Sequence, residues 1–138
     1  MLNDSYFVDT GAWVALFDLN DQYHFRAEKF LSSIKGRHYL FFTSDYILDE
    51  SITFIRRRIG HSAAIKFKNF VEITATIKLH LINAEIQSQA WDIFCKYSDH
   101  DFSFTDCTSF AFMQTMGLKK AFTFDKHFVI AGFEIFPV

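Results

Sequence analysis

The sequence predicts an α/β protein of three layers, in which helices cover both faces of a mostly parallel five-stranded sheet. Two observations favour this fold class. Short apolar or β-branched runs alternate along the chain with longer stretches of helical periodicity, which is typical of a parallel sheet. Half of the residues are hydrophobic, 19 residues are Phe, and 22% are charged. This composition excludes a disordered chain and provides a large apolar core.

Five segments have the composition of short strands, and five have the spacing of helices. The expected strands are Tyr6 to Val8, Tyr39 to Thr43, Lys78 to Ile82, Ala121 to Phe124 and Glu134 to Phe136. Each is short and apolar enough to be buried on both faces of a sheet. The expected helices are Tyr23 to Ile34, Asp45 to Ile59, Ser62 to Thr76, Ala84 to Tyr97 and Asp106 to Met116. Gly117 is expected to end the last helix as its C-cap.

The chain has no internal sign of a boundary between domains. Its one Pro is Pro137 and its five Gly are dispersed, so residues 1–138 are expected to form a single domain. No apolar run approaches the roughly 20 residues that span a bilayer, and Met1 to Asp4 lack the basic flank of a signal peptide. We therefore expect a cytoplasmic protein that does not enter a membrane.

The two cysteines, Cys95 and Cys107, form no C-x-x-C pair, and the six His have no spacing typical of a zinc site. The formal net charge is −2. If the protein binds nucleic acid, it is expected to do so through a local patch or a metal ion, because the chain as a whole is not basic.

Three aspartates are expected at one edge of the sheet. Asp9 follows the first predicted strand, Asp125 follows the fourth, and Asp106 begins a predicted helix. In parallel sheets, ligands gather outside the carboxyl ends of the strands. The first turn of a helix also favours an anion.

Glu50 is a fourth candidate, for a different reason. On the predicted helix Asp45 to Ile59, its neighbours at i±4 and i−3 are Tyr46, Phe54 and Ile47, so the carboxylate is expected within an apolar arc. A buried unpaired charge is costly. A divalent cation shared with the aspartates would remove that cost, and oxygen ligands suit Mg²⁺ or Mn²⁺. Acids without a nearby catalytic His or Cys fit metal-assisted hydrolysis of phosphodiesters.

Each acid also has a simpler interpretation. Asp106 alone fits a helix N-cap, and Asp125 before Lys126 fits a turn residue. Glu50 would be solvated if the helix phase were shifted by one position.

Two other functions remain open from the residues alone. Asp9-Thr10-Gly11 matches the active-site tripeptide of aspartic proteases, whose carboxylates share a proton, although that fold is nearly all strand and turn. A catalytically silent binding module would keep the fold and offer only its surface.

The basic cluster Arg56-Arg57-Arg58 is either a solvated helix surface or a rim that contacts RNA or a protein partner beside the acids. The aromatic excess is assigned mainly to the core. In the alternative interpretation, a surface that binds a partner or a second copy of the chain is formed by Trp13, Phe17 and Tyr23.

Several segments resemble the successive acidic blocks of PIN-domain ribonucleases, in the family's order. They are Phe7-Val8-Asp9-Thr10-Gly11-Ala12, Asp49-Glu50-Ser51, Phe102-Ser103-Phe104-Thr105-Asp106, Phe122-Thr123-Phe124-Asp125-Lys126-His127-Phe128 and Gly132-Phe133. The resemblance implies that the ligands of Mg²⁺ or Mn²⁺ are Asp9, Glu50, Asp106 and Asp125. It implies a ribonuclease that acts on single-stranded or structured RNA. It also implies that Thr10 supports the ligands without binding the ion itself. Asp101 is either an additional acid or a solvated loop residue.

Within the PIN-domain family, so short a chain resembles the VapC-type toxins of toxin-antitoxin pairs. This resemblance implies a homodimer that a small antitoxin protein holds inactive.

Overall fold

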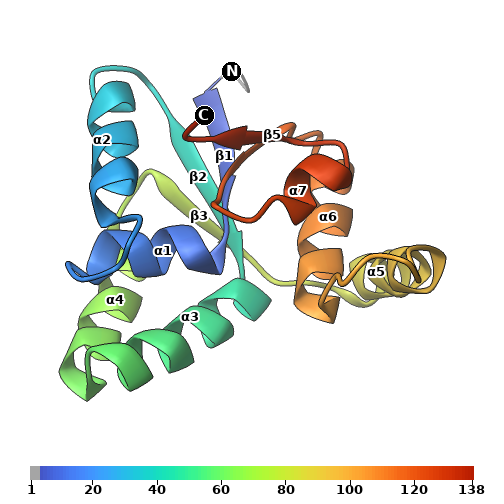
Figure 1. Ribbon diagram of the computed structural model, residues 1–138, viewed down its shortest axis with the longest axis horizontal. Helices are drawn as coiled ribbons and strands as arrows, with labels where there is room; N and C mark the ends of the chain where they lie inside the picture. Colours follow the sequence, from blue (N-terminus) through green and yellow to red (C-terminus); the bar gives the residue numbers. More distant parts are fainter. Residues whose placement is uncertain (1–3) are drawn as a thin grey trace.

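The computed structural model describes residues 4–138, and a five-stranded sheet of the order β3-β2-β1-β4-β5 forms its middle layer (Figure 1). The strands are β1 (Ser5–Val8), β2 (Leu40–Ser44), β3 (Ile77–His80), β4 (Lys120–Phe122) and β5 (Glu134–Phe136). Every neighbouring pair is parallel, so the predicted fold class is confirmed and the sheet is wholly parallel. Met1 to Asn3, which entered the expectation about a signal peptide, lie outside the described residues.

Helices cover both faces of this sheet (Figure 1). One face carries α1 (Thr10–Phe17), α2 (His24–Ile34), α3 (Asp45–Arg58) and α4 (His61–Ile73), and the other carries α5 (Ala84–Lys96), α6 (Phe104–Met116) and α7 (His127–Ile130). The sequence did not predict α1 or α7. Five of the eight residues of α1 are buried, so it lacks the polar face that makes a helix recognisable, and α7 is a single turn.

Two helix boundaries differ from the prediction by more than one residue. Helix α4 ends three residues early, because Thr74 already has extended backbone angles. Helix α6 begins two residues early, at Phe104, because Ser103 is its N-cap. The Ser103 hydroxyl accepts a hydrogen bond from the Asp106 N–H at 2.9 Å, and the Asp106 carboxylate accepts one from the Ser103 N–H at 3.1 Å. Asp106 is therefore the third helical residue of a capping box, and the N-cap interpretation is wrong.

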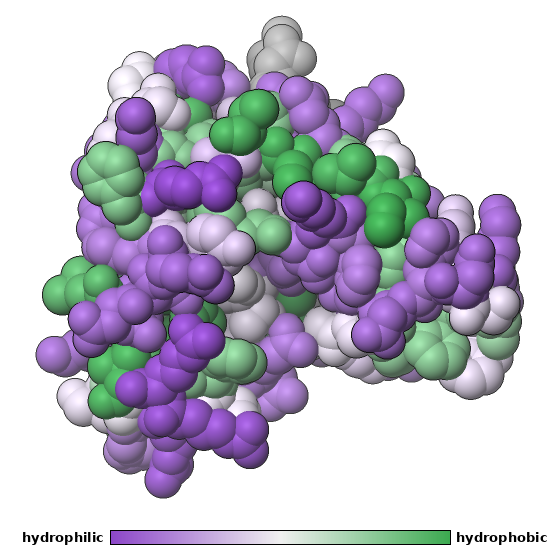
Figure 2. Space-filling view, viewed as in Figure 1, coloured by the Kyte–Doolittle hydropathy of each residue, from purple (hydrophilic) through white to green (hydrophobic). Residues whose placement is uncertain are grey.

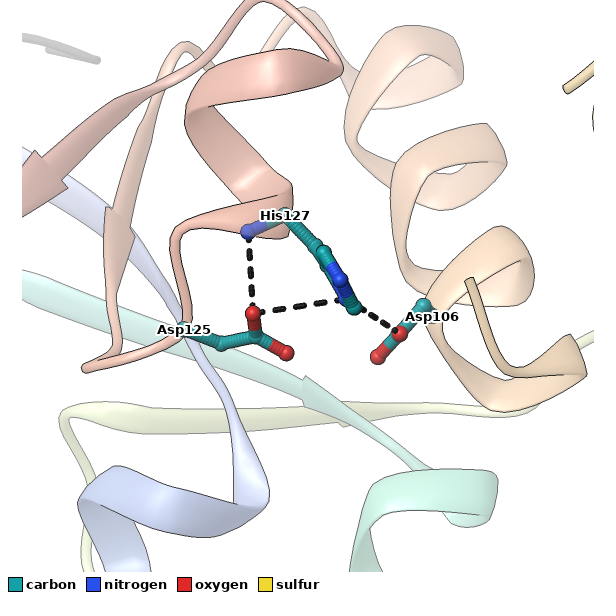
Figure 3. Close-up of side chains that lie close together, drawn as sticks. All are labelled: Asp106, Asp125 and His127. Atoms are coloured by element: carbon teal, nitrogen blue, oxygen red, sulfur yellow. Dashed lines mark hydrogen bonds and ion pairs between the residues drawn. The ribbon is translucent and has the colours of Figure 1, made fainter. Parts of the chain in front are cut away.

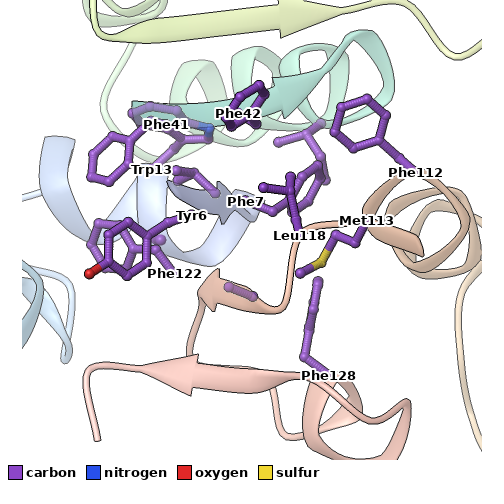
Figure 4. Close-up of a cluster of buried hydrophobic side chains, with 14 of the residues drawn as sticks. Tyr6, Phe7, Trp13, Phe41, Phe42, Phe112, Met113, Leu118, Phe122 and Phe128 are labelled. Atoms are coloured by element: carbon purple, nitrogen blue, oxygen red, sulfur yellow. The ribbon is translucent and has the colours of Figure 1, made fainter. Parts of the chain in front are cut away.

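The central strand β1 is buried on both faces and joins the two helical layers. Tyr6 packs on Phe30 of α2 with ring centroids 5.3 Å apart, and Phe7 packs on Phe112 of α6 at 5.7 Å. Figure 4 shows Tyr6, Phe7 and Phe112 among the buried side chains that gather around β1. Trp13 is 1% exposed, so the alternative of a surface position is wrong for this residue. The edge strands β3 and β5 are only partly buried, contrary to the expectation of burial on both faces.

Candidate active site

Asp9 lies at the junction of β1 and α1 and is 8% exposed. It is the N-cap residue of α1 without a side-chain cap bond. Its Oδ2 instead accepts a hydrogen bond of 3.0 Å from the Thr123 hydroxyl. Thr123 directly follows β4, which is paired with β1. The parallel pairing of these two strands therefore holds a carboxylate that was expected at this edge because it follows the first predicted strand.

Asp106 and Asp125 converge on a histidine that the sequence analysis missed. Ligand atoms of Asp106, Asp125 and His127 lie within 4.8 Å of one another (Figure 3). The His127 Nδ1 is 3.4 Å from Asp106 Oδ2 and 3.4 Å from Asp125 Oδ1. The expectation of acids without a nearby His is therefore wrong. The only sequence signal for His127 was its place two residues after Asp125, a residue for which a turn was one of the expectations.

Hydrogen bonds from backbone N–H groups to side-chain oxygens hold the loop that carries Asp125. Its N–H donates to the Thr123 hydroxyl at 3.0 Å, and its Oδ1 accepts from the His127 N–H at 2.9 Å. Asp125 is thus a turn residue as well as a cleft residue. Because Thr123 also donates to Asp9, one hydroxyl ties two of the candidate acids together.

Glu50 reaches the site from the exposed surface of α3. Its Oε1 accepts a hydrogen bond from the Thr10 hydroxyl of α1 at 2.5 Å. The expectation that Glu50 lies in a buried apolar arc is wrong, because Glu50 is exposed and its neighbour Phe54 is 43% exposed. The packing of α1 against α3 and the Thr10 hydroxyl position this carboxylate.

All four predicted acids line one cleft of about 570 Å³, together with Thr10 and His127. Its size is that of a small-molecule or cofactor site. Figure 2 shows that the face seen in Figure 1 is hollowed between its left and right halves, with hydrophilic side chains over much of it. Asp101 is exposed in the loop before α6, and the described residues that line the cleft do not include it.

The clustering of the acids changes their titration. Burial raises the pKa of Asp9 from 3.8 to about 7; the negative charges of Asp106 and Asp125 add to this, and the hydrogen bond from Thr123 opposes it. Burial also raises the pKa of Asp106, with a contribution from Asp125. A divalent cation would relieve this repulsion. Three aspartates and a glutamate suit a hard ion such as Mg²⁺ or Mn²⁺, so the residues present fit a metal site.

The three arginines of the predicted rim have different surroundings. Arg58 lines the acidic cleft, but its Nη1 is 2.9 Å from Asp21 Oδ2 and 3.7 Å from Asp18 Oδ2. Arg57 lines a neighbouring cavity of about 580 Å³ that shares Glu50 with the cleft. Arg56 is exposed, and neither set of lining residues includes it.

Residues 6–134 match the family of the PIN domain. The chain belongs to the PIN-domain family. This PIN domain is 33% identical over 127 residues to the 23S rRNA-specific endonuclease VapC20 of Mycobacterium tuberculosis, an alignment that covers 92% of this chain and 94% of VapC20. The expected resemblance to VapC-type toxins is confirmed.

Solved structures agree with this assignment. The crystal structure of M. tuberculosis VapC20, a sarcin-ricin loop cleaving toxin, matches this PIN domain with a TM-score of 0.85 and 32% identity, over 93% of this chain and 95% of that chain. VapBC2 from Rickettsia felis, bound to a DNA fragment from its promoter, matches with a TM-score of 0.72 over 95% and 96% of the chains, at 8% identity. The second likeness is one of fold alone.

The aspartic protease alternative is wrong. Thr10 and Gly11 are the first residues of helix α1, so the tripeptide that begins at Asp9 is a strand-to-helix junction. The all-parallel sheet of a PIN domain is also unlike the strand-and-turn fold of those proteases.

Proposed function

We propose that this PIN domain is a metal-dependent ribonuclease, and that it is the toxin of a toxin-antitoxin pair. The observation that carries the proposal is the convergence of Asp9, Glu50, Asp106 and Asp125 on one cleft. The likeness to a 23S rRNA-specific endonuclease over most of both chains supports RNA as the substrate class. Within that class, we propose ribosomal RNA as the first substrate to examine.

The four acids are proposed as the ligands of Mg²⁺ or Mn²⁺, with His127 beside them. When bound, such an ion supplies a Lewis acid for the phosphate and a water of lowered pKa. The protein's own part is positioning. Thr123 orients Asp9, Thr10 orients Glu50, and the capping box at Ser103 fixes the helix that carries Asp106.

The partners proposed for this chain are RNA, a small antitoxin protein and a second copy of the chain. The structure of VapC20, at 32% identity, is that of a toxin, which supports a cognate antitoxin here. The homodimer rests on the resemblance to VapC-type toxins and is testable by light scattering. None of the helices in residues 4–138 is long and apolar enough to cross a membrane. The cytoplasmic location is proposed on a separate ground, because the proposed substrate is cellular RNA.

The most informative experiment offers the purified protein mixed RNAs, including 23S rRNA, with Mg²⁺, with Mn²⁺ or with EDTA. Cleavage that requires either ion and stops in EDTA is the expected result. A catalytically silent binding module would leave every RNA intact, and titration calorimetry would then reveal whether it binds the ions at all.

Glu50→Gln is expected to lower the cleavage rate at least about 100-fold, whereas Asp49→Asn is expected to leave it nearly unchanged. The two residues point about 100° apart on α3. Glu50 accepts the Thr10 hydrogen bond in the acidic cleft, whereas Asp49 lines the neighbouring cavity. Initial rates of cleavage by the two variants test this assignment. An essential Asp49 with a dispensable Glu50 would contradict it.

Arg57→Ala is expected to weaken RNA binding several-fold at low salt while metal affinity stays at its wild-type value. Arg57 is exposed and lines the same cavity as Glu50, so its contact with a phosphate would be electrostatic. The loss of RNA affinity in the variant is therefore expected to become smaller as ionic strength rises. Fluorescence anisotropy at several salt concentrations measures this effect. Arg56→Ala is the matched control. Unchanged affinity, cleavage and antitoxin binding in Arg57→Ala would establish a solvated surface instead.

A further inference from the structure

A stacked aromatic pair forms part of the wall of the acidic cleft. Tyr23 precedes α2, and Phe124 lies between β4 and Asp125. Their ring centroids are 4.4 Å apart, with planes inclined by only 3°. Both residues line the cleft together with the candidate acids, and both are half-buried. The pair is therefore accessible from the cleft, unlike the aromatic rings around β1.

An arginine lies beside this pair. The Arg26 guanidinium carbon is 5.8 Å from the centroid of Tyr23 and 5.5 Å from that of Phe124. Because the two distances are nearly equal, one cation serves both rings. Arg26 is exposed, and the ion pairs found among residues 4–138 do not include it. By contrast, Arg58, which also lines the cleft, is already paired with Asp18 and Asp21.

The positive charge continues away from the acids along α2. Arg26 also lines a second cavity of about 450 Å³, with Phe25 and Lys29 among the other lining residues. Aromatic rings interleaved with exposed cations are the usual composition of a surface that binds single-stranded nucleic acid. Here such a surface extends from Tyr23 in the acidic cleft, through Arg26, to this second cavity.

We propose that Tyr23 and Phe124 form a stacking site for one unpaired base of the RNA, and that Arg26 contacts the neighbouring phosphate. The inference rests on the proposed ribonuclease function. Phe124 directly precedes Asp125, so the stacked base would belong to a nucleotide near the phosphodiester that the acids receive. Every base has a π-face, so this site would select an unstacked nucleotide, as in an RNA loop, with little preference for sequence.

The test uses a single-stranded RNA decamer with 2-aminopurine at one central position, because the fluorescence of this base falls when it stacks on an aromatic ring. Binding is measured in Ca²⁺, which takes the same kind of oxygen ligands as Mg²⁺. Wild-type protein is expected to quench the fluorescence. Tyr23→Leu is expected to lose the quenching and to bind about 5- to 100-fold more weakly. Tyr23→Phe, which keeps the ring, is expected to behave as wild type.

Phe94→Leu is the matched control, because Phe94 belongs to another exposed stacked pair, with Trp91 at 5.5 Å, whose residues are not among those that line the acidic cleft. It is expected to quench and bind as wild type does. Thermal unfolding by circular dichroism verifies that each variant is folded. Arg26→Gln is expected to lower the slope of log affinity against log salt concentration by about 1, the value for one lost phosphate contact.

Quenching that is unchanged in Tyr23→Leu, or equally reduced in Phe94→Leu, would overturn the stacking site. Cleavage of 23S rRNA in Mg²⁺ is measured separately. A protein that cuts this RNA without Tyr23-dependent quenching would refute the stacking site and leave the ribonuclease standing. Tyr23-dependent quenching without cleavage would support the stacking site and count against the ribonuclease.

Discussion

Asp9→Asn is expected to reduce RNA cleavage by roughly 1000-fold or more while the protein stays folded. Asp9 is buried where β1 meets α1, and its carboxylate accepts a hydrogen bond from Thr123. Asparagine keeps the shape of the side chain and an oxygen that accepts this bond, but it removes the negative charge that a divalent ion requires. Initial cleavage rates with saturating Mg²⁺ measure the loss, and circular dichroism measures the fold.

Asp101→Asn is the matched control for this experiment. Asp101 is an exposed aspartate in the loop before α6, so its substitution removes the same charge outside the cleft. We expect an unchanged cleavage rate. Full activity in a folded Asp9→Asn protein would remove the basis of the proposed metal site, and a large loss in Asp101→Asn would restore this residue as an additional acid.

The same substitution, Asp9→Asn, is expected to stabilise the metal-free protein by roughly 2–4 kcal/mol at pH 8. The pKa of Asp9 is raised from 3.8 to about 7 by burial and by Asp106, so the folded state binds more protons than the unfolded state between these two values. The free energy of unfolding of the wild type therefore falls as the pH rises through this window. Urea unfolding in EDTA at several pH values measures the difference.

The pH dependence provides the internal control. Near pH 4 the Asp9 carboxyl is protonated in the folded protein, so the gain from Asn is expected to be small, and it grows until about pH 7. Added Mg²⁺ is expected to stabilise the wild type more than the variant, because an ion that binds only the folded state raises its stability. A variant less stable than wild type at pH 8 in EDTA would contradict the clustering of the acids.

The alternation of strands and helices was sufficient to predict the parallel sheet and the edge at which Asp9 and Asp125 lie. These residues follow strands, and strand ends are recognisable from composition. The partners of the acids were not predictable in this way. Thr123 contacts Asp9 across 114 positions, through the pairing of β1 with β4, and strand order is not written in local periodicity.

Glu50 was chosen for a reason that proved wrong. Helical spacing identifies which residues share a face of α3, but it does not determine which face is buried. The α1 helix covers part of α3, and α1 itself was not predicted because its hydrophobic residues occur on all sides. His127 was missed because its contact with Asp106 spans 21 positions, which local periodicity does not reveal.

The pairing of β1 with β4 also determines when, during synthesis on the ribosome, the active site can exist. Asp9 and Glu50 are made early, whereas a nascent chain that ends before Phe104 has neither Asp106 nor Asp125. The central strand β1 also lacks one of its two neighbours until β4 has left the exit tunnel. Contacts so distant in sequence form late in folding. An unfinished polypeptide that lacks β4 therefore carries no assembled site, and the four acids cannot converge until Asp125 has left the exit tunnel.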